Sequence, residues 1–509
     1  MIPKIKDKPT MVIAGPGAGK THEMVSRIVG TIKYLRPNRI LAAITFTNAA
    51  TDSIREKVQD LIQIPPNVFI GTNYSFFNQF ILLPFGTLFE YIPSDKLFLE
   101  IDVRRIVEEK LQRKGHPAAL QAIRKRVLNS LLKEGKIPFE QIVEISSDLM
   151  KNPQIQKIVC NRIQFLFKDE FQDTDTTQMR IFDAIRKGKK TIIYSVGDPE
   201  QYILGFTYNN RRVKKPSFRN IPINKFASGC DKRENCVNKR ACEELVQFTN
   251  NFHTSIKQKS EVGAIEQGGV FFIADTDLHG IIPKFIELTQ TIIDSRKNSR
   301  RLFLGYENKT FSGFVEKYGL VPISNEHRRP SSTLRESLEL LASAVQLSSK
   351  GIKDKHDLDA VGYRKLGIKL LKAVIAGRTL TIEQLRRFLT DDLCLQCQYD
   401  VVNLETKLEG LKSLLNRENI MSANNFYSSI HKAKGLEAEC VLIVSKSKKE
   451  LAKWLETDVE ERCKDKADTC RIGYVGFTRA KYILCIACKQ PIDGSIENTL
   501  LNLKVKILN

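Results

Sequence analysis

The stretch that decides the fold is MVIAGPGAGKTHEMV, residues 11–25, in which an apolar run leads into a glycine-rich turn. The pattern predicts a strand, a tight turn and a helix that begins near Lys20. Gly15, Gly17 and Gly19 allow the backbone to curl so that its N–H groups point at phosphate oxygens, and the helix N-terminus adds positive potential. The stretch therefore predicts a phosphate-binding loop.

A nucleotide is the expected ligand of this loop, because the spacing is G-x-x-x-x-G-K-[ST] with a small residue, Ala14, in the first position. Lys20 would neutralise the β and γ phosphates, and the hydroxyl of Thr21 would ligate Mg²⁺. ATP and Mg²⁺ are the predicted cofactors. The predicted nucleotide-binding residues of the loop are Ala14, Gly15, Pro16, Gly17, Ala18, Gly19, Lys20 and Thr21.

A second stretch, KDEFQDTD at 168–175, places four acids directly after an apolar run. Acids in this position are often turn residues that bond to the local backbone. The phosphate loop favours another interpretation, because Mg²⁺·ATP needs an acid for the metal and a base for the attacking water. We assign Asp169 to the metal and Glu170 to the base. Gln201, which follows the next predicted strand, is assigned to the γ-phosphate.

The charge balance favours a polyanionic partner such as nucleic acid. Lys and Arg outnumber Asp and Glu by 80 to 58, a formal net charge of +22. An anionic membrane surface would need an amphipathic or anchored segment that we do not find, and no apolar run approaches the ~18 residues of a membrane span. We expect a cytoplasmic protein of about two to four domains, without a membrane partner.

The 11 cysteines are spread too thinly for a disulfide scaffold. Cys394 and Cys397 form one close pair, and Cys485 and Cys488 form another within an apolar run. Their spacing matches no standard zinc or iron–sulfur pattern, so packing is favoured over a metal site.

Six motifs together resemble the UvrD/Rep-like branch of superfamily 1 DNA helicases. They follow the family order along the whole chain: AGPGAGKT, TFTNAATDSIREKV, DEFQDTD, VGDPEQYILGF, SIHKAKGLE and YVGFTRAK. The resemblance implies an ATP hydrolase coupled to translocation along DNA or to its unwinding, in the 3′ to 5′ direction. A P-loop ATPase unrelated to nucleic acid would leave both the charge and the ordered motifs unexplained.

The resemblance also assigns catalytic residues. Arg479 would be the arginine finger and would act with Lys20, Glu170 and Gln201. The other nucleotide-binding residues that it implies are Arg240, Gly435 and Glu437.

Two departures from the family pattern affect recognition of the base. Lys239 replaces the tyrosine that would stack on it, one position before Arg240. The family reads adenine with a glutamine upstream of the phosphate loop, whereas no glutamine precedes Gln59 here. We therefore predict weak discrimination among purine nucleotides.

Contacts with DNA are expected from polar and aromatic side chains near the motifs. Aromatic rings would stack on bases while basic side chains follow the phosphates. For each aromatic residue, the alternative to stacking on a base is packing in the core. RNA is an open alternative to DNA, because these contacts do not read the 2′-OH. The DNA-binding candidates are Thr47, Asn48, Tyr74, Phe76, Phe206 and His431.

A narrower resemblance, to the helicase subunits of the Gabija antiphage defence system, rests on GTNYSFFNQFILLPF at 71–85, the early phosphate loop and the short chain. It implies an OLD-family (GajA-like) nuclease as partner, and single-stranded DNA or duplex ends as substrate. Two alternatives stay open. The chain could be a DNA-end-sensing ATPase that regulates such a nuclease without processive unwinding, or a stand-alone UvrD-like repair helicase.

The expected fold class is α/β, with two RecA-like P-loop NTPase cores in which parallel sheets carry helices on both faces. Each core is interrupted by a helical accessory insertion, and the second insertion has apolar residues at helical spacing that are typical of a core. These apolar residues are Leu334, Leu338, Leu341 and Val345. The expected boundaries are 1–85 and 137–214 for the first core, 86–136 for its insertion, 215–305 and 421–509 for the second core, and 306–420 for its insertion.

Overall fold

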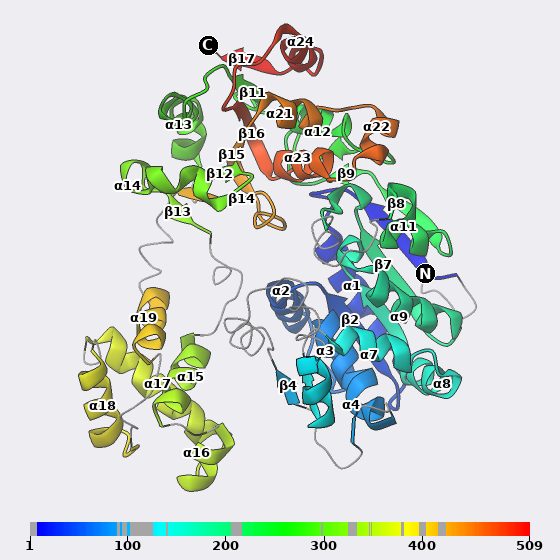
Figure 1. The fold of residues 1–509 in the computed structure, drawn as a ribbon, viewed down its shortest axis with the longest axis vertical. Helices are drawn as coiled ribbons and strands as arrows, with labels where there is room; N and C mark the ends of the chain where they lie inside the picture. The colour runs from blue at the N-terminus through cyan, green and yellow to red at the C-terminus, as the bar shows by residue number, and fades with distance from the viewer. Residues whose placement is uncertain are drawn as a thin grey trace. The chain divides into compact units, whose positions relative to one another are not determined.

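The computed structural model forms two compact units (Figure 1). The first contains Met1–Ile292, Leu304–Tyr306 and Ser429–Asn509, and the second contains Ile293–Phe303 and Glu307–Ser428. The structure describes residues 8–88, 92–93, 99–101, 126–138, 141–204, 216–296, 299–323, 333–345, 347, 349–377, 381–396, 404–415 and 424–508.

A six-stranded parallel sheet carries the phosphate loop. Its strand order is β3-β2-β6-β7-β1-β8, so the central strands β6, β7 and β1 are neighbours in space although they are far apart in the sequence. The strands are β1 (Thr10–Ala14), β2 (Ile40–Thr45), β3 (Val68–Thr72), β6 (Ile163–Lys168), β7 (Ile192–Gly197) and β8 (Asp231–Asn235).

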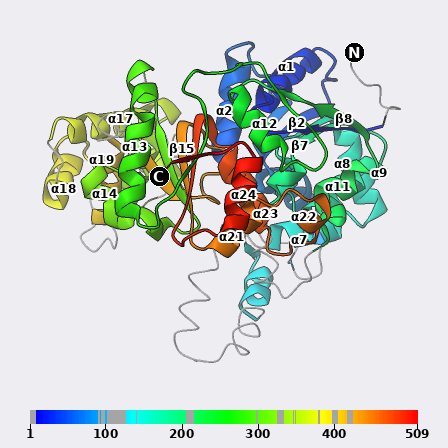
Figure 2. The ribbon, with the colours of Figure 1, turned by 90° about the horizontal axis from the view of Figure 1, so that it is seen from above.

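Both faces of this sheet are covered, which explains why its central strands are buried and mostly apolar. Met11 and Ile13 pack into one hydrophobic cluster, and Val12 and Ala14 pack into the cluster on the other face. Figure 2 shows α1 and α2 on one side of strands β2 and β7, with α7 and α11 on the other. The helices are α1 (Lys20–Ile32), α2 (Asn48–Gln59), α3 (Asn73–Phe77), α4 (Leu83–Phe85), α7 (Ile142–Leu149), α8 (Pro153–Arg162), α9 (Thr176–Lys187) and α11 (Pro222–Ala227).

A seven-stranded sheet has the order β13-β14-β12-β15-β16-β11-β17. Its central pairs β15–β16 and β11–β16 are parallel. Two parallel sheets with helices confirm the expected α/β class of two RecA-like cores. The strands are β11 (Gly269–Ile273), β12 (Arg301–Gly305), β13 (Val321–Pro322), β14 (Asn425–Ser429), β15 (Ala438–Ser445), β16 (Ala480–Cys488) and β17 (Lys506–Leu508). The neighbouring helices in the sequence are α12 (Glu243–Asn250), α13 (Leu278–Ser295), α14 (Val315–Tyr318), α21 (Lys448–Trp454), α22 (Val459–Lys464), α23 (Thr469–Phe477) and α24 (Gly494–Asn502).

Five helices of the second unit share a hydrophobic cluster of their own. Leu341 and Val345, from the stripe noted in the sequence, are buried in this cluster, and Leu334 and Leu338 are half-buried. The helices are α15 (Thr333–Ala344), α16 (Ser349–Lys355), α17 (Ala360–Ile375), α18 (Ile382–Asp391) and α19 (Leu404–Leu415).

Two segments differ from the expected division of the chain into two cores with helical insertions. Strand β8, which we expected in the second core, pairs with β1 along the edge of the first sheet. In the first insertion, β4 (Leu99–Ile101) pairs with β5 (Lys136–Pro138), and residues 126–133 are helical. Residues 102–125 of that insertion lie outside the described residues. None of the described helices combines the length and apolar character needed to cross a bilayer.

Candidate nucleotide-binding site

Three neighbouring strands bring the predicted motifs to one edge of the first sheet. Strand β1 ends in the phosphate loop, β6 ends before Asp169 and Glu170, and β7 ends before the segment that holds Gln201. Because β6, β7 and β1 are parallel, their carboxyl ends lie at the same edge, where ligands bind in open α/β sheets.

The phosphate loop has the backbone conformation that its glycines allow. Gly17 and Gly19 have φ values of 72° and 75°, which disfavour residues with a Cβ. Gly19 is the N-cap of α1, so the helix begins at Lys20 as the sequence predicts. The Lys20 ammonium donates to the carbonyls of Ala14 and Gly15 at 3.2 and 3.3 Å, within the loop that would surround a phosphate.

Two side chains that the sequence did not single out hold this loop from outside. The amides of Asn238 and Gln258 donate to the carbonyl of Pro16 at 3.0 and 3.1 Å. A Cβ at Gly17 would collide with the Asn238 amide, so glycine is required there for close approach as well as for φ. Strand β9 (Val237–Asn238), which pairs with β10 (Lys259–Ser260), carries Asn238 to the loop.

The acid pair at the end of β6 suits a divalent cation. Asp169 is 3% exposed, and burial, followed by the charge of Glu170, raises its pKa to about 6. Its carboxylate accepts a hydrogen bond from the backbone N–H of Glu170 at 2.9 Å. An oxygen donor set of Asp169 with the hydroxyl of Thr21, in the first turn of α1, fits the preference of Mg²⁺ for hard oxygen ligands.

Cations surround the proposed base. Burial alone would raise the pKa of Glu170, but the charges of Lys20 and Lys434 outweigh it, so that the pKa lies below its usual range. Gln172 also donates a hydrogen bond to this carboxylate. Glu170 has φ 47°, a left-handed conformation that is uncommon for a residue other than glycine. A carboxylate that stays ionised in this position can accept a proton from water.

Gln201 lies in a 3-10 turn, Pro199–Gln201, directly after β7, where its side chain donates to Asp198 at 2.9 Å. The Lys434 ammonium donates to the carbonyl of Gln201 at 2.8 Å and also to Asp173. Lys434 belongs to the motif SIHKAKGLE, but the sequence alone assigned no role to it. It joins the turn after β7 to the acids after β6.

Arg479, which follows α23, lies beside Arg240, which follows β9, because the Arg240 guanidinium donates to the carbonyl of Thr478. Burial, followed by the charge of Arg240, lowers the pKa of Arg479 to about 9, which leaves it protonated at neutral pH. Its guanidinium donates to the carbonyls of Val475 and Leu436 at 2.8 and 3.2 Å. Glu437 forms an ion pair with Arg240 at 2.9 Å.

Arg240 also has an unsatisfied donor. Its buried Nε has no hydrogen-bond acceptor among the described residues, although one terminal nitrogen of the same guanidinium donates to the carbonyl of Thr478 at 2.7 Å. A phosphate oxygen would satisfy this Nε, which fits the nucleotide-binding role expected of Arg240. Gly435, on the same segment as Glu437, has φ 84°.

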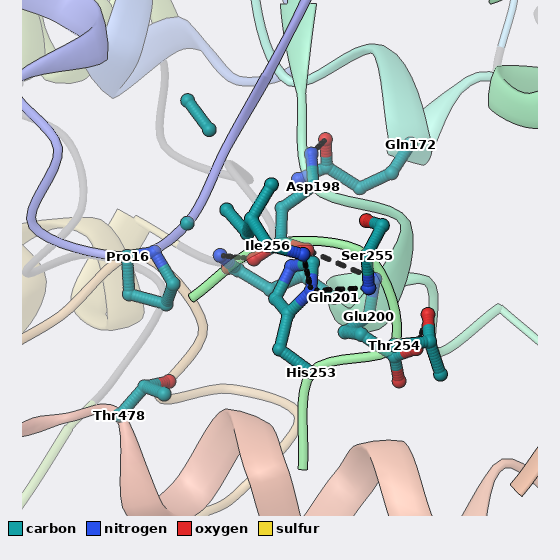
Figure 3. Close-up of polar contacts among 12 residues, drawn as sticks. Pro16, Gln172, Asp198, Glu200, Gln201, His253, Thr254, Ser255, Ile256 and Thr478 are labelled. Carbon is teal, nitrogen blue, oxygen red and sulfur yellow. Dashed lines mark hydrogen bonds and ion pairs between the residues drawn. The ribbon is translucent and has the colours of Figure 1, made fainter. Parts of the chain in front are cut away.

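A buried polar network extends from the turn after β7 to the segment after α12 (Figure 3). Asp198 accepts from Gln201, and its backbone N–H donates to Gln172 at 3.0 Å. His253 Nε2 lies 3.1 Å from Asp198 Oδ1. Glu200 accepts from Thr254 at 2.7 Å. No sequence motif pointed to His253 or Thr254.

The same Glu200 carboxylate is paired with buried arginines. Arg462 approaches it at 2.9 Å and Arg471 at 3.6 Å, and the exposure of all three side chains is 2% or less.

The DNA-binding candidates differ in their burial and contacts. Thr47 is the N-cap of α2 and accepts from the N–H of Ala50, and Asn48 is the first residue of that helix. Tyr74 is half-buried and packs against the core. His431 lies edge-on to Tyr306, with 6.0 Å between ring centroids.

The structure contradicts one of these expectations, and another concerns a residue outside the described part of the chain. Phe76 has no exposed surface and packs against Phe69, Phe77 and Phe80, so it is a core side chain that presents no face to a base. Phe206 lies outside the described residues.

The close cysteine pairs contribute no ligand cluster to the described part of the chain. Cys485 and Cys488 are buried in β16, where burial raises the pKa of the Cys485 thiol well above its usual value. No group of three or more potential ligands gathers among the described residues. Cys397 lies outside them.

Comparisons with known proteins find similar helicase sequences. Residues 2–127 and 95–212 match the UvrD/REP helicase N-terminal domain family. Gabija protein GajB from Bacillus cereus is 23% identical over 97% of this chain and 96% of its own length. DNA helicase II from Rickettsia typhi is 27% identical over 39% of this chain and 36% of its own length. ATP-dependent DNA helicase Rep from Buchnera aphidicola (subsp. Acyrthosiphon pisum) is 24% identical over 43% of this chain and 40% of its own length.

Proposed function

Because this chain belongs to the UvrD/Rep family of ATP-dependent DNA helicases, we propose that ATP binding and hydrolysis at this site drive its movement along a single DNA strand. The observation that carries the proposal is the environment of Glu170, whose carboxylate is bonded to Gln172 and whose pKa is lowered by the charges of Lys20, Lys434 and Arg479. A cluster of cations around one ionised carboxylate suits a site that stabilises a transferring phosphoryl group and activates a water beside it.

Each residue then has one role. Lys20 and the loop N–H groups bind the β and γ phosphates, and Arg479 and Arg240 bind the γ-phosphate from the opposite side. Glu170 accepts the proton of the attacking water, and Gln201 orients the γ-phosphate. Thr21 and Asp169 hold Mg²⁺, which supplies charge neutralisation on the phosphates when it is bound.

Hydrolysis is coupled to movement because the two sheets contribute different parts of the site. Lys20 and Glu170 follow strands of the first sheet, whereas Arg479 precedes β16 of the second. A γ-phosphate contacted from both sides favours a closed arrangement, and its loss removes that preference. A DNA strand held through Thr47, Asn48, Tyr74 and His431 would advance once per cycle.

The likeness to GajB along nearly the whole chain supports a finer proposal. The chain is the helicase subunit of an antiphage defence complex and acts with an OLD-family nuclease. In this setting hydrolysis serves either to unwind DNA ahead of the nuclease or to report a DNA end to it. Co-purification with such a nuclease, and its control by ATP, would support the finer proposal. A free monomer that unwinds long duplexes by itself would contradict it.

Phosphate release by the purified chain, with and without single-stranded DNA, tests the motor. We expect strong stimulation by DNA, and Glu170→Gln serves as the blank because it keeps the size of the side chain while removing the base. Lys20→Ala is expected to abolish hydrolysis and to leave salt-sensitive DNA binding in place. Retained hydrolysis in Lys20→Ala would refute the assignment of the site. Hydrolysis by the wild-type chain that ignores DNA would refute the coupling.

A further inference from the structure

The nucleotide site lies at the carboxyl ends of the strands of the first sheet, and a strongly basic surface lies at their amino ends. The amino ends of the parallel strands β2, β6 and β7 meet there, and one stretch of chain leads into each strand. These segments are residues 33–39, residues 153–164, which comprise α8 and the start of β6, and residues 184–193, which run from the end of α9 to the start of β7. They are distant in the sequence, but the parallel topology brings them to one edge.

Hydrogen bonds join the three segments directly. The Arg39 guanidinium donates to the carbonyls of Ile163 and Lys190 at 2.5 and 2.8 Å. Arg162 donates to the carbonyl of Asn38 at 2.8 Å. The segments therefore form one continuous surface whose backbone is fixed by its own arginines.

The charge of this surface has one sign. The three segments hold nine basic residues and no Asp or Glu, although the average acid content of the chain would predict about three acids in a stretch of this total length. Asp183, just before the third segment, is already paired with Arg186 and Lys187. We define the amino-end surface by its exposed cations, which are Lys33, Arg36, Lys157, Arg162, Lys187, Lys189 and Lys190.

Several of these cations have no carboxylate to neutralise them. Within the described residues, no ion pair is formed by Arg36, Lys157, Lys189 or Lys190. Like charges held together by the fold destabilise it unless counter-ions or a polyanion gather on them. The arrangement therefore points to a polyanionic ligand.

The scarcity of exposed aromatic rings on this surface favours duplex over single-stranded nucleic acid as the ligand. A single-stranded track interleaves its cations with several aromatic platforms for the bases. Here only Tyr34 offers an exposed ring among the three segments, and Lys33 already lies over it at 5.2 Å. A duplex keeps its bases stacked inside and presents only phosphates, so cations without platforms fit duplex DNA.

We propose that the amino-end surface is a second nucleic-acid site, which holds the phosphate backbone of duplex DNA while the strand being tracked lies near the nucleotide site. This inference rests on the proposed function, because it assigns a place to the duplex that a translocase on a single strand meets. Its contacts are to phosphates, so binding there is independent of sequence and is strongly weakened by salt.

The test removes four charges from the amino-end surface and four from a control surface. The test variant is Arg36→Gln/Lys157→Gln/Lys189→Asn/Lys190→Gln. The control variant is Lys448→Gln/Lys449→Gln/Lys489→Gln/Lys504→Asn, on exposed positions outside the first sheet. The two sets match in formal charge, although Lys448 is paired with Asp493 at 3.6 Å. They also match in backbone, since Lys189 and Lys504 have φ values of 50° and 59°, which asparagine tolerates.

Binding of a blunt duplex and of a single strand, by fluorescence anisotropy at several salt concentrations, gives the readout. For the test variant we expect duplex affinity to fall at least about tenfold. The slope of log K against log salt should decrease by about 0.9 for each phosphate that the variant no longer neutralises. Single-strand binding and DNA-stimulated phosphate release should stay within about twofold of wild type. The control variant should bind duplex within about twofold of wild type.

Three results would overturn the inference. Duplex binding that is unchanged in the test variant would mean that the amino-end surface does not bind DNA and that its ligand is an acidic protein. Equal losses in the test and control variants would mean that only net charge matters. Equal losses for duplex and single strand would place the tracked strand on this surface instead. Failure of the motor itself would appear separately, as wild-type hydrolysis that ignores DNA. If the fourfold test variant unfolds, Arg36→Gln/Lys190→Gln carries the same comparison against Lys449→Gln/Lys489→Gln.

Discussion

His253 and Asp198 share a buried hydrogen bond, with 3.1 Å between Nε2 and Oδ1. The backbone N–H groups of Ser255 and Ile256 both donate to Nδ1 of the same ring, at 3.2 and 3.1 Å. A ring nitrogen that accepts hydrogen bonds carries no proton, so the proton lies on Nε2 and is donated to Asp198. The neutral imidazole therefore links the loop after α12 to the turn that carries Gln201.

Replacing His253 by alanine should weaken both the fold and the motor. Asp198 would lose a buried donor, at a cost of about 1–3 kcal/mol in the free energy of unfolding. Because Asp198 also holds Gln201, we expect kcat for DNA-stimulated hydrolysis to fall about three- to tenfold with little change in KM for ATP. His253→Gln keeps a donor and should recover part of both losses. Thermal unfolding and steady-state kinetics measure them, and an alanine variant that matches wild type in both would contradict the link.

Breaking the ion pair between Arg462 and Glu200 should lower the free energy of unfolding more than replacing His253 does. Both side chains are buried, and Arg462→Met would leave the carboxylate with Arg471, at 3.6 Å, as its remaining cation and with the hydrogen bond from Thr254. An uncompensated buried charge costs about 3–5 kcal/mol, and we expect the lower end because Arg471 remains. The double variant Arg462→Met/Glu200→Gln removes the charge as well and should be more stable than the single variant. Urea denaturation compares the two, and equal instability would show that packing of the arginine, not its charge, is what matters.

The parts of the site that the sequence predicted are those in which a few adjacent residues specify both the structure and the chemistry. The glycines around Lys20 fix the loop, and an apolar strand before Asp169 and Glu170 fixes their place at its end. Lys434, His253 and Gln258 reach the site from distant segments, so that only the tertiary fold brings them there. Lys434 lies within a motif, but the motif alone does not assign it this role, and His253 and Gln258 lie outside the motifs.

Two errors of expectation have physical causes that a single sequence does not reveal. Phe76 lies in an aromatic stretch that could face a base or the core, and the choice depends on which face of α3 packs inward. Strand β8 has the sequence DKREN, whose charges are typical of a loop. Its residues are mostly exposed because it lies at the edge of the first sheet, where charge protects an edge strand from further pairing.

The stability of the fold should depend on pH through His431. Burial, followed by the charge of Lys434, lowers the pKa of His431 below its ordinary value near 6.5. The unfolded chain therefore takes up the proton first as the pH falls. Stability is highest above about pH 6.5, decreases as the pH falls from there through the lowered pKa, and then levels off. His431→Gln should flatten this part of the profile, measured as the melting temperature between about pH 5 and 7.5. An unchanged slope would mean that other groups cause it.

Discrimination between ATP and GTP should be weak, because the chain lacks both side chains with which the family it resembles recognises the base. Lys239 stands where the family tyrosine would stack, and the amide of Gln258 is already engaged with Pro16, Val237 and Asn238. A site without hydrogen bonds to the base edge cannot reject a purine that differs only there, so kcat/KM for the two nucleotides should agree within about fivefold. Phosphate release with each triphosphate, in the presence of single-stranded DNA, measures this ratio. A preference for ATP of about a hundredfold or more would contradict the prediction and would require a base-reading residue that closes on the nucleotide only when it binds.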